Sequence, residues 1–297
     1  MSKDRDKRLE NAYQLLQAGQ YQKALREYEI ALLDDPADIE VLQRKADLQA
    51  KMLMRTEAAE TLFQLGVALA RADKTLKAIS AFKKVLRLEP ETIDAHVHIS
   101  NLYMKMGMAA DAKPHLETLA HFCEDQGNPK ELLNIYRQLV AADPSNVATR
   151  IRLGEIYSSF DMNTEAVREF SKAASELKKQ SRLDEYIMVI ERLIYHDPSR
   201  TEQVKEVANI YIQLGQLKKA LGKLRVAYQQ DPSDLETLEM MNTAFRQTGQ
   251  IGKAIRTCKA MIQLHIESGA LDQVQRLYRD ILDMDPNDPD AQQFLEM

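Results

Sequence analysis

Six prolines recur along the chain at regular intervals, each preceded by an acidic residue at the end of an apolar run. They are Pro36, Pro90, Pro144, Pro198, Pro232 and Pro286, separated by 54, 54, 54, 34 and 54 residues. Because the proline ring cannot continue an α-helix, each of these residues marks a place where a helix has just ended. Regularly spaced helix ends predict an array of internal repeats.

The shortest interval shows the repeated element most clearly. Residues 199–232 place apolar or small side chains at Val204, Val207, Ala208, Tyr211, Ala220, Leu224, Ala227 and Pro232. This pattern resembles the tetratricopeptide repeat (TPR), in which Leu-Gly/Ala and Tyr are followed by Ala, an aromatic residue, Ala and Pro. Residues 1–36 agree through Ala12, Leu15, Ala24, Tyr28, Ala31 and Pro36. The resemblance implies an all-α, right-handed solenoid of antiparallel helices.

The 54-residue intervals are 34 residues plus 20, and 20 residues is one further helix with its turn. Aligning 37–90, 91–144, 145–198 and 233–286 gives a column of alanines: Ala58, Ala112, Ala166 and Ala254. The middle helix is expected to be long, closing one repeat and opening the next. We therefore expect about 17 helices in segments 1–36, 37–90, 91–144, 145–198, 199–232 and 233–286, with a partial helix at 287–297. With no Ser/Gly linker in view, we expect one continuous solenoid over residues 1–297.

Glycines mark the turn after the first helix in four segments. They are Gly19, Gly107, Gly215 and Gly249, where a left-handed residue can end a helix at low cost. Leu53 and Asp161 hold the same place in two other segments. Asn128 followed by Pro129 predicts the start of a third helix, and Ser181 to Asp184 predicts a weaker cap of the same kind.

The composition limits the class of protein. The chain has 40 Lys+Arg against 45 Asp+Glu and a net charge of −5, which argues against a general nucleic-acid binder. Two distant cysteines, Cys123 and Cys258, form no disulfide or zinc pattern and fit a reducing compartment. The charged start has no apolar run behind it, and no apolar stretch is long enough to span a bilayer. We expect a cytoplasmic protein without membrane insertion.

No motif with catalytic chemistry is recognisable. The sequence lacks a phosphate-binding loop, HExxH, GxSxG and paired cysteines. His96 and His98 are two residues apart on a helix, so they point in different directions and are poorly placed to share a metal ion. We therefore expect no enzyme activity, no cofactor and no metal site.

In TPR proteins the first helix of each pair lines a groove that holds peptides or folded partners, and the resemblance implies the same here. Residues projecting from these helices form three columns in the alignment. They are Arg44, His98 and Arg152; Asp47, Asn101, Glu155 and Asn209; and Lys51 with Lys105. Polar residues in register can offer hydrogen bonds to an extended backbone, and the alternative is a solvated face.

Chaperone-binding TPRs grip a terminal carboxylate with a clamp of lysines, asparagines and an arginine. Only Lys205 and Asn209 match that clamp, both in one repeat, and Glu236 and Met240 do not continue it. We expect the clamp to be absent and keep Lys205 as a candidate partner-binding residue.

A closer resemblance is carried by residues 166–198, AVREFSKAASELKKQSRLDEYIMVIERLIYHDP, and by the 34-plus-20 spacing. Both are similar to deltaproteobacterial TPR regulators of motility and polarity, a group that includes the myxobacterial regulator of type IV pili. That resemblance implies a protein partner such as the Ras-like GTPase MglA in its GTP form, and recruitment to a cell pole.

The leading hypothesis is a non-catalytic interaction scaffold or adaptor. The alternatives are a co-chaperone-like module that binds peptides, and self-association through the last helix by Phe294 and Leu295. Helical-repeat RNA binding is disfavoured by the acidic charge balance.

Overall fold

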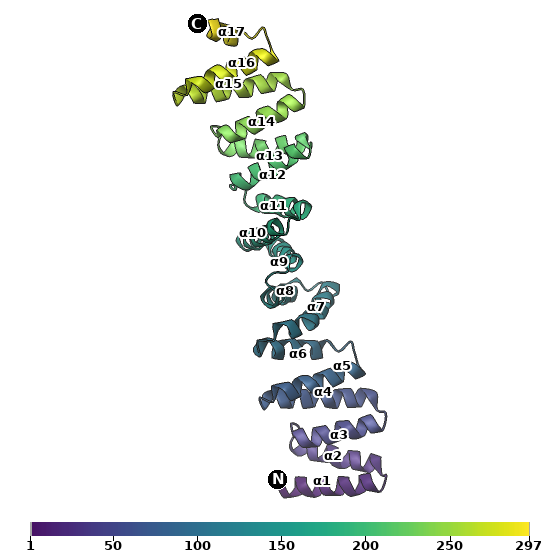
Figure 1. Cartoon of the computed structure of the whole chain (residues 1–297). Coiled ribbons are helices and arrows are strands. Elements are labelled where there is room, and N and C mark those ends of the chain that lie inside the picture. The colour runs from purple at the N-terminus through teal and green to yellow at the C-terminus, as the bar shows by residue number, and fades with distance from the viewer. Residues whose placement is uncertain (1, 297) are drawn as a thin grey trace. The chain divides into compact units, whose positions relative to one another are not determined.

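The structure, a computed structural model, describes residues 2–296 and the side chains of residues 4–294. This part of the chain contains 17 α-helices and no strand (Figure 1). The helices are α1 Ser2–Gln17, α2 Tyr21–Asp34, α3 Ile39–Lys51, α4 Arg55–Arg71, α5 Thr75–Leu88, α6 Ile93–Lys105, α7 Ala109–Asp125, α8 Pro129–Ala142, α9 Val147–Ser159, α10 Asn163–Lys179, α11 Leu183–His196, α12 Thr201–Gln213, α13 Leu217–Gln230, α14 Leu235–Gln247, α15 Ile251–Glu267, α16 Leu271–Met284 and α17 Pro289–Glu296. The predicted all-α fold with about 17 helices is confirmed.

The helix lengths repeat with the sequence. In segment 37–90 the three helices have 13, 17 and 14 residues, and segments 91–144, 145–198 and 233–286 repeat this order. Segment 199–232 has only helices of 13 and 14 residues. The 20 additional residues are therefore the long middle helix with its turn.

Residues 1–149 and 150–297 form two compact units. In the N-terminal unit, each helix from α1 to α8 packs on the next one in the chain. In the C-terminal unit, the same neighbour packing joins α10 to α17, and α9 contacts α10 through Arg150 and Gly154. The alanine column is fully buried, because a small side chain at this place lets neighbouring helices approach closely.

The turns that follow the first helix of each segment close in one way. The four predicted glycines have φ between 70° and 73°, and Leu53 and Asp161 adopt the same left-handed conformation with φ of 61° and 57°. The turns after the middle helices repeat this feature at Asp73, Gly127, Ser181 and Gly269. The sequence prediction missed this second set, which follows the same rule of helix termination.

One predicted helix cap is confirmed and one is wrong. The Asn128 side chain accepts a hydrogen bond from the Glu131 amide at 3.3 Å, with Pro129 at the first helical position. Ser181, however, belongs to the preceding turn with φ of 56°. The residue that flanks α11 is Arg182, which makes no capping hydrogen bond through its side chain.

Candidate functional site

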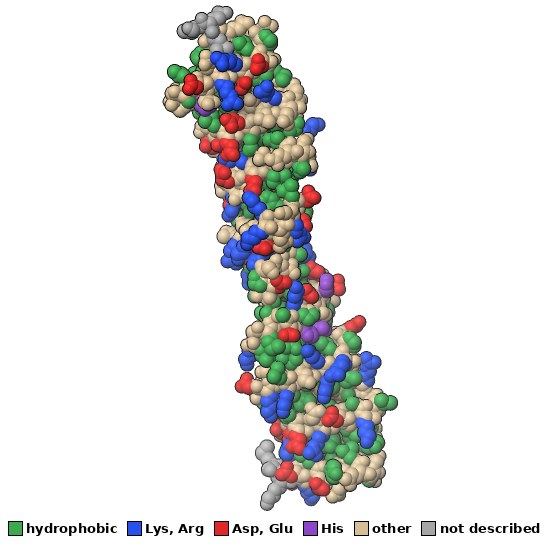
Figure 2. Space-filling view, in the orientation of Figure 1, with side chains coloured by type: hydrophobic (Ala, Val, Ile, Leu, Met, Phe, Trp, Pro, Cys, Tyr) green, Lys and Arg blue, Asp and Glu red, His purple; other side chains and the backbone are tan. Residues whose placement is uncertain are grey.

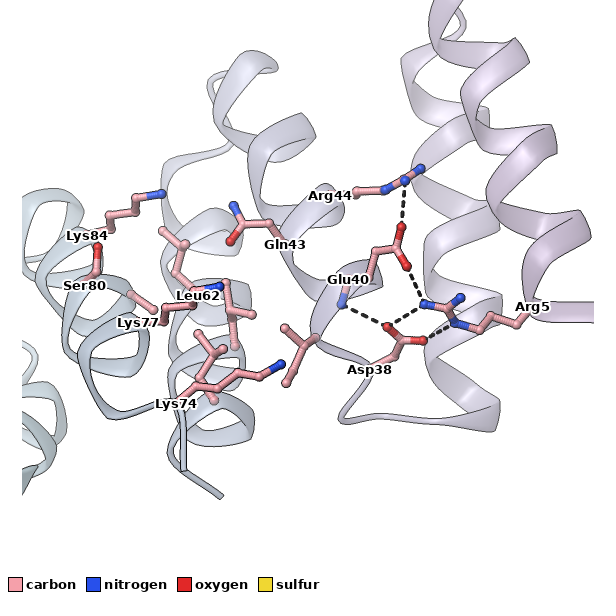
Figure 3. A pocket seen from close by; sticks show the side chains of 14 residues that line it. Arg5, Asp38, Glu40, Gln43, Arg44, Leu62, Lys74, Lys77, Ser80 and Lys84 are labelled. Carbon is pink, nitrogen blue, oxygen red and sulfur yellow. Dashed lines mark hydrogen bonds and ion pairs between the residues drawn. The ribbon is translucent and has the colours of Figure 1, made fainter. Parts of the chain in front are cut away.

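The N-terminal unit contains an open groove of about 680 Å³ that lies along α4 between α3 and α5 (Figure 3). Helix α4 packs on both neighbours, so it forms the floor, and α3 and α5 form the walls. The side chains that line it are Arg5, Asp38, Ile39, Glu40, Gln43, Arg44, Leu62, Leu65, Leu69, Lys74, Lys77, Ser80, Ala81 and Lys84. We refer to this feature as the α4 groove.

The floor of the α4 groove is apolar. Leu62, Leu65 and Leu69 are spaced by three and four residues, so they share one face of α4. Each is at most 5% exposed, because the neighbouring helices cover most of its surface. The part that reaches the groove can receive an apolar side chain from another molecule.

The α3 wall carries acidic groups that are already paired. The Asp38 carboxylate caps α3 by accepting hydrogen bonds from the amides of Glu40 and Val41 at 2.9 and 3.1 Å. Arg5 donates to Asp38 at 2.5 Å and to Glu40 at 2.7 Å, and Arg44 donates to the other oxygen of Glu40 at 2.7 Å. The hydrogen bond from Arg5 lowers the pKa of Asp38, and the same contacts raise the pKa of Arg5. This network joins α1 to α3 and neutralises both acids.

The α5 wall carries lysines. Lys77 and Lys84 are seven residues apart, two helical turns, and Ser80 lies between them. Lys74 precedes the first residue of α5, and its side chain extends across the groove toward α3 (Figure 3). None of these three lysines makes an ion pair with any side chain in residues 4–294. Both charge signs are interspersed over the visible face of the molecule (Figure 2), so this cationic wall is a local feature.

The predicted residues of α3 lie on its exposed face. Arg44 is part of the α4 groove, where Glu40 holds its guanidinium. The Asp47 carboxylate accepts hydrogen bonds from the side-chain amide of Gln43 at 3.0 Å. The Lys51 ammonium lies 4.6 Å from the centre of the Tyr21 ring, in a cation–π contact.

The predicted residues of α6 differ in burial. The His98 ring is half-buried and stacks on Phe82 with ring centres 4.8 Å apart, and burial lowers its pKa. Asn101 and Lys105 are exposed, and the Lys105 ammonium lies 3.5 Å from the Asp73 carboxylate. His98 is therefore a packing residue of the α5–α6 contact, and Asn101 and Lys105 are the accessible members of this set.

In the C-terminal unit, Arg152 and Glu155 pair with each other along α9 at 3.2 Å, and Glu155 also pairs with Arg192 of α11. Lys205 is buried, while Asn209 is exposed on the same helix. The ten predicted residues therefore fall into two sets, six in the N-terminal unit and four in the C-terminal unit.

Lys205 is held by three carboxylates. Its ammonium lies 2.8 Å from Glu202, 3.4 Å from Asp234 and 2.5 Å from Glu236. The hydrogen bonds that the Lys205 ammonium donates to Glu202 and Glu236 raise its pKa. The Lys205 side chain links α12 to α14, and its ammonium is engaged by these carboxylates.

Lys74, Lys77 and Lys84 were missed because the candidate columns were placed on first helices, whereas these lysines lie on or beside a third helix. The alignment of the segments does contain a signal that distinguishes these lysines. The positions that match Lys77 hold Glu131, Glu185 and Gln273, so the lysine-rich third helix is specific to segment 37–90.

A second groove, of about 450 Å³, lies between α9 and α11 in the C-terminal unit. Its charged residues are engaged: Arg192 pairs with Glu155, and Glu191 pairs with Lys223 at 3.1 Å. Met188 and Tyr195 form an exposed apolar rim, with Tyr195 81% exposed. The α4 groove thus differs from it in carrying unpaired cations.

Neither a metal centre nor a membrane span is found in the described residues. No group of three or more His, Cys, Asp or Glu side chains among them is arranged to hold a metal ion. Over the same residues, no helix combines the length and the apolar character that crossing a bilayer requires.

Two stretches of the chain match models described as tetratricopeptide repeat, residues 60–92 and residues 116–148. The first begins within α4 and includes α5, and the second begins within α7 and includes α8. Both matches pair a middle helix with the helix that follows it. This agrees with the expectation that a middle helix opens a repeat.

Similarity to individual proteins is remote. Stress-induced-phosphoprotein 1 of Caenorhabditis elegans is 22% identical over 259 residues, which are 80% of this chain and 77% of that protein. The structure of the TPR2AB-domain:pHSP90 complex of yeast Sti1 is 15% identical, covers 96% of this chain and 99% of that chain, and has a TM-score of 0.34. A tetratricopeptide repeat protein from Parabacteroides merdae is 16% identical, covers 93% and 98%, and has a TM-score of 0.27. At these values neither structure locates a binding site on this chain.

Proposed function

The chain carries tetratricopeptide repeats, and we propose that it is a non-catalytic scaffold that holds a segment of a partner protein in the α4 groove. The observation that supports this is an open groove that combines a floor of largely buried leucines with polar walls fixed on helices. Grooves of this kind receive an apolar side chain on the floor and hydrogen-bond or ion-pair partners along the walls. Because the walls are helical, little conformational entropy is lost when a ligand binds.

For the partner itself we propose a protein, and as a specific candidate the GTP form of a Ras-like GTPase such as MglA. This candidate rests on the sequence similarity of residues 166–198 to regulators of motility and polarity. With this partner we also propose a cytoplasmic location and recruitment to a cell pole. A co-chaperone-like role is the alternative, since the yeast Sti1 structure contains pHSP90.

Self-association through the last helix is a further alternative. Phe294 stacks on Tyr278 of α16 with ring centres 4.4 Å apart, and Ala291 is buried. Phe294 is thus engaged within the chain, which makes it less available to a second copy. The Leu295 side chain lies outside the described residues.

The scaffold proposal can be tested by filling the groove. Gln43 lines it, and Gln43→Trp should block it without changing the net charge. Gln22→Trp makes the same substitution at an exposed position of α2 and is the matched control. Each variant and the unaltered chain serve as bait in lysate of the source organism, with a non-hydrolysable GTP analogue or with GDP.

We expect defined proteins to be captured by the unaltered chain and by Gln22→Trp, and to be lost with Gln43→Trp. Capture that is unaffected by Gln43→Trp would exclude the α4 groove as the docking site. Enrichment of a Ras-like GTPase only with the GTP analogue would support that partner. Enrichment of other proteins with either nucleotide would exclude it and leave the scaffold role in place.

A further inference from the structure

The charges that line the α4 groove do not balance. Five cations, Arg5, Arg44, Lys74, Lys77 and Lys84, face two anions, Asp38 and Glu40, so 5 − 2 leaves a net charge of +3. The two arginines satisfy both anions. The excess is therefore carried by the three lysines of the α5 wall. This excess occurs in a chain whose net charge is −5.

The fold does not require these lysines. In the aligned segments, the position of Lys84 holds Gln138, Arg192 and Asp280, and the position of Lys74 holds Asn128, Arg182 and Ala270. The two arginines in this comparison are engaged, Arg182 with Glu185 at 2.7 Å and Arg192 with Glu155. Three helices of the same lengths thus form in the other segments without an unpaired cationic wall.

Two of the lysines also lie at the N-terminus of a helix, the end that attracts negative charge. Lys74 and Lys77 flank the N-terminus of α5, whose first turn contains no acidic residue. The helix dipole places partial positive charge at this end, so nearby lysines are disfavoured there unless an anion is present. A bound carboxylate would interact favourably with both the lysines and the dipole.

From these observations we propose that the α4 groove selects an acidic peptide segment that carries an apolar side chain between its carboxylates. The carboxylates pair with Lys74, Lys77 and Lys84, and the apolar side chain rests on Leu62, Leu65 and Leu69. Lys77 and Lys84 are about 10 Å apart along α5, which an extended peptide spans with about three residues. This inference rests on the proposed function and adds the chemistry of the ligand.

The floor favours a peptide over a nucleic acid. Single-stranded nucleic acids are held by aromatic side chains on which bases stack, and no aromatic residue is among those that line the groove. The leucines instead match an aliphatic or aromatic side chain of a protein ligand.

The test is fluorescence anisotropy with a labelled peptide, Glu-Asp-Leu-Glu-Glu-Leu-Asp-Glu, acetylated and amidated so that it has no terminal charge. The variant Lys74→Glu/Lys77→Glu/Lys84→Glu reverses the α5 wall. The control Lys23→Glu/Lys130→Glu/Lys218→Glu makes the same charge change at three exposed lysines outside the groove. Circular dichroism checks that both variants retain their helices, and single Lys→Ala variants at the wall serve if the triple variant does not fold.

We expect the wall variant to weaken binding at least tenfold and the control to weaken it less than threefold. Replacing both leucines of the peptide by serine should also weaken binding several-fold, and 0.5 M salt should nearly abolish it. Equal losses in the two variants, or no binding by the unaltered chain, would overturn the proposal. Tight binding of poly-U that depends on the wall, with no peptide binding, would also overturn it. Partner capture that is lost with Gln43→Trp but kept with the wall variant would refute only the acidic selectivity, leaving the scaffold role intact.

Discussion

Gly66 of α4 lies directly against the Phe82 ring of α5, so that a Cβ atom at Gly66 would stand 2.7 Å from the ring. Gly154 of α9 has the same relation to Phe170 of α10, at 2.6 Å. Phe82 and Phe170 are almost fully buried, so neither ring can move aside into solvent. The two contacts show how a glycine in one helix lets the aromatic residue of the next helix approach its backbone.

We predict that Gly66→Ala destabilises the chain by about 1–3 kcal/mol, since the added methyl group overpacks a closed site. Thermal and urea unfolding followed by circular dichroism measure the change. The matched control is Gly222→Ala in α13, where nothing lies within 4 Å of the new Cβ atom. There the better helix propensity of alanine should stabilise by about 0.5–1 kcal/mol. Equal effects at the two positions would contradict the packing argument.

A second prediction concerns the carboxylate cluster at Lys205. Lys205→Met should lower the free energy of unfolding by about 1 kcal/mol, because Glu202, Asp234 and Glu236 lose their shared cation. The loss should shrink when salt is raised, since the carboxylates other than Asp234 are exposed. Lys218→Met removes an exposed lysine of α13 and should change stability by less than about 0.5 kcal/mol. A salt-independent loss would point to side-chain packing instead.

A third prediction concerns the pH dependence of the α6–α7 contact. The Nδ1 atoms of His96 and His115 lie 3.0 Å apart, which requires that at least one ring be neutral. Burial, together with His96 and Lys83, lowers the pKa of His115 to about 4, and burial also lowers the pKa of His96. The unfolded chain therefore takes up these protons at higher pH than the folded chain does. The contribution to stability is complete above about pH 6.5 and is lost as the pH falls toward 4.

Hydrogen exchange of residues 93–125 between pH 7 and 4, corrected for the intrinsic rate, measures this loss locally. His115→Gln should flatten the pH dependence of protection, because one of the two buried rings can no longer take up a proton. His121→Gln is the control, since the His121 side chain is 81% exposed. If both variants keep the full pH dependence, the histidine pair is not its source.

A fourth prediction concerns α17. Phe294→Ala removes the ring that stacks on Tyr278, so the amides of residues 289–294 should lose protection from hydrogen exchange. The molar mass measured by light scattering should stay the same, because Phe294 packs within its own chain. A fall in mass would show instead that Phe294 holds copies together.

Much of the fold could be predicted because its determinants are local. Proline, glycine and the spacing of apolar residues fix where helices end, and they located all the helices that the structure describes. The left-handed turns at Asp73 and Ser181 were missed since neither residue carries the signal that glycine does. The same locality explains the wrong cap at Ser181.

The side chains of the candidate site were harder to predict because their roles depend on distant partners. The burial of Lys205 arises from Asp234 and Glu236, about thirty residues later, and no local pattern indicates that pairing. To predict the α4 groove, one must know which faces of α3 and α5 remain uncovered when both helices pack on α4. Of the ten candidate residues, only Arg44 lies in that groove.

The long middle helix makes contact on both sides, with the first helix of its segment and with the third. In ordinary repeat arrays a terminal repeat can open while its neighbour stays folded, since no helix is shared between two repeats. A helix such as α4 cannot leave one pair without also leaving the other. We therefore expect α3, α4 and α5 to open together, so that a ligand bound over α4 stabilises all three helices against unfolding.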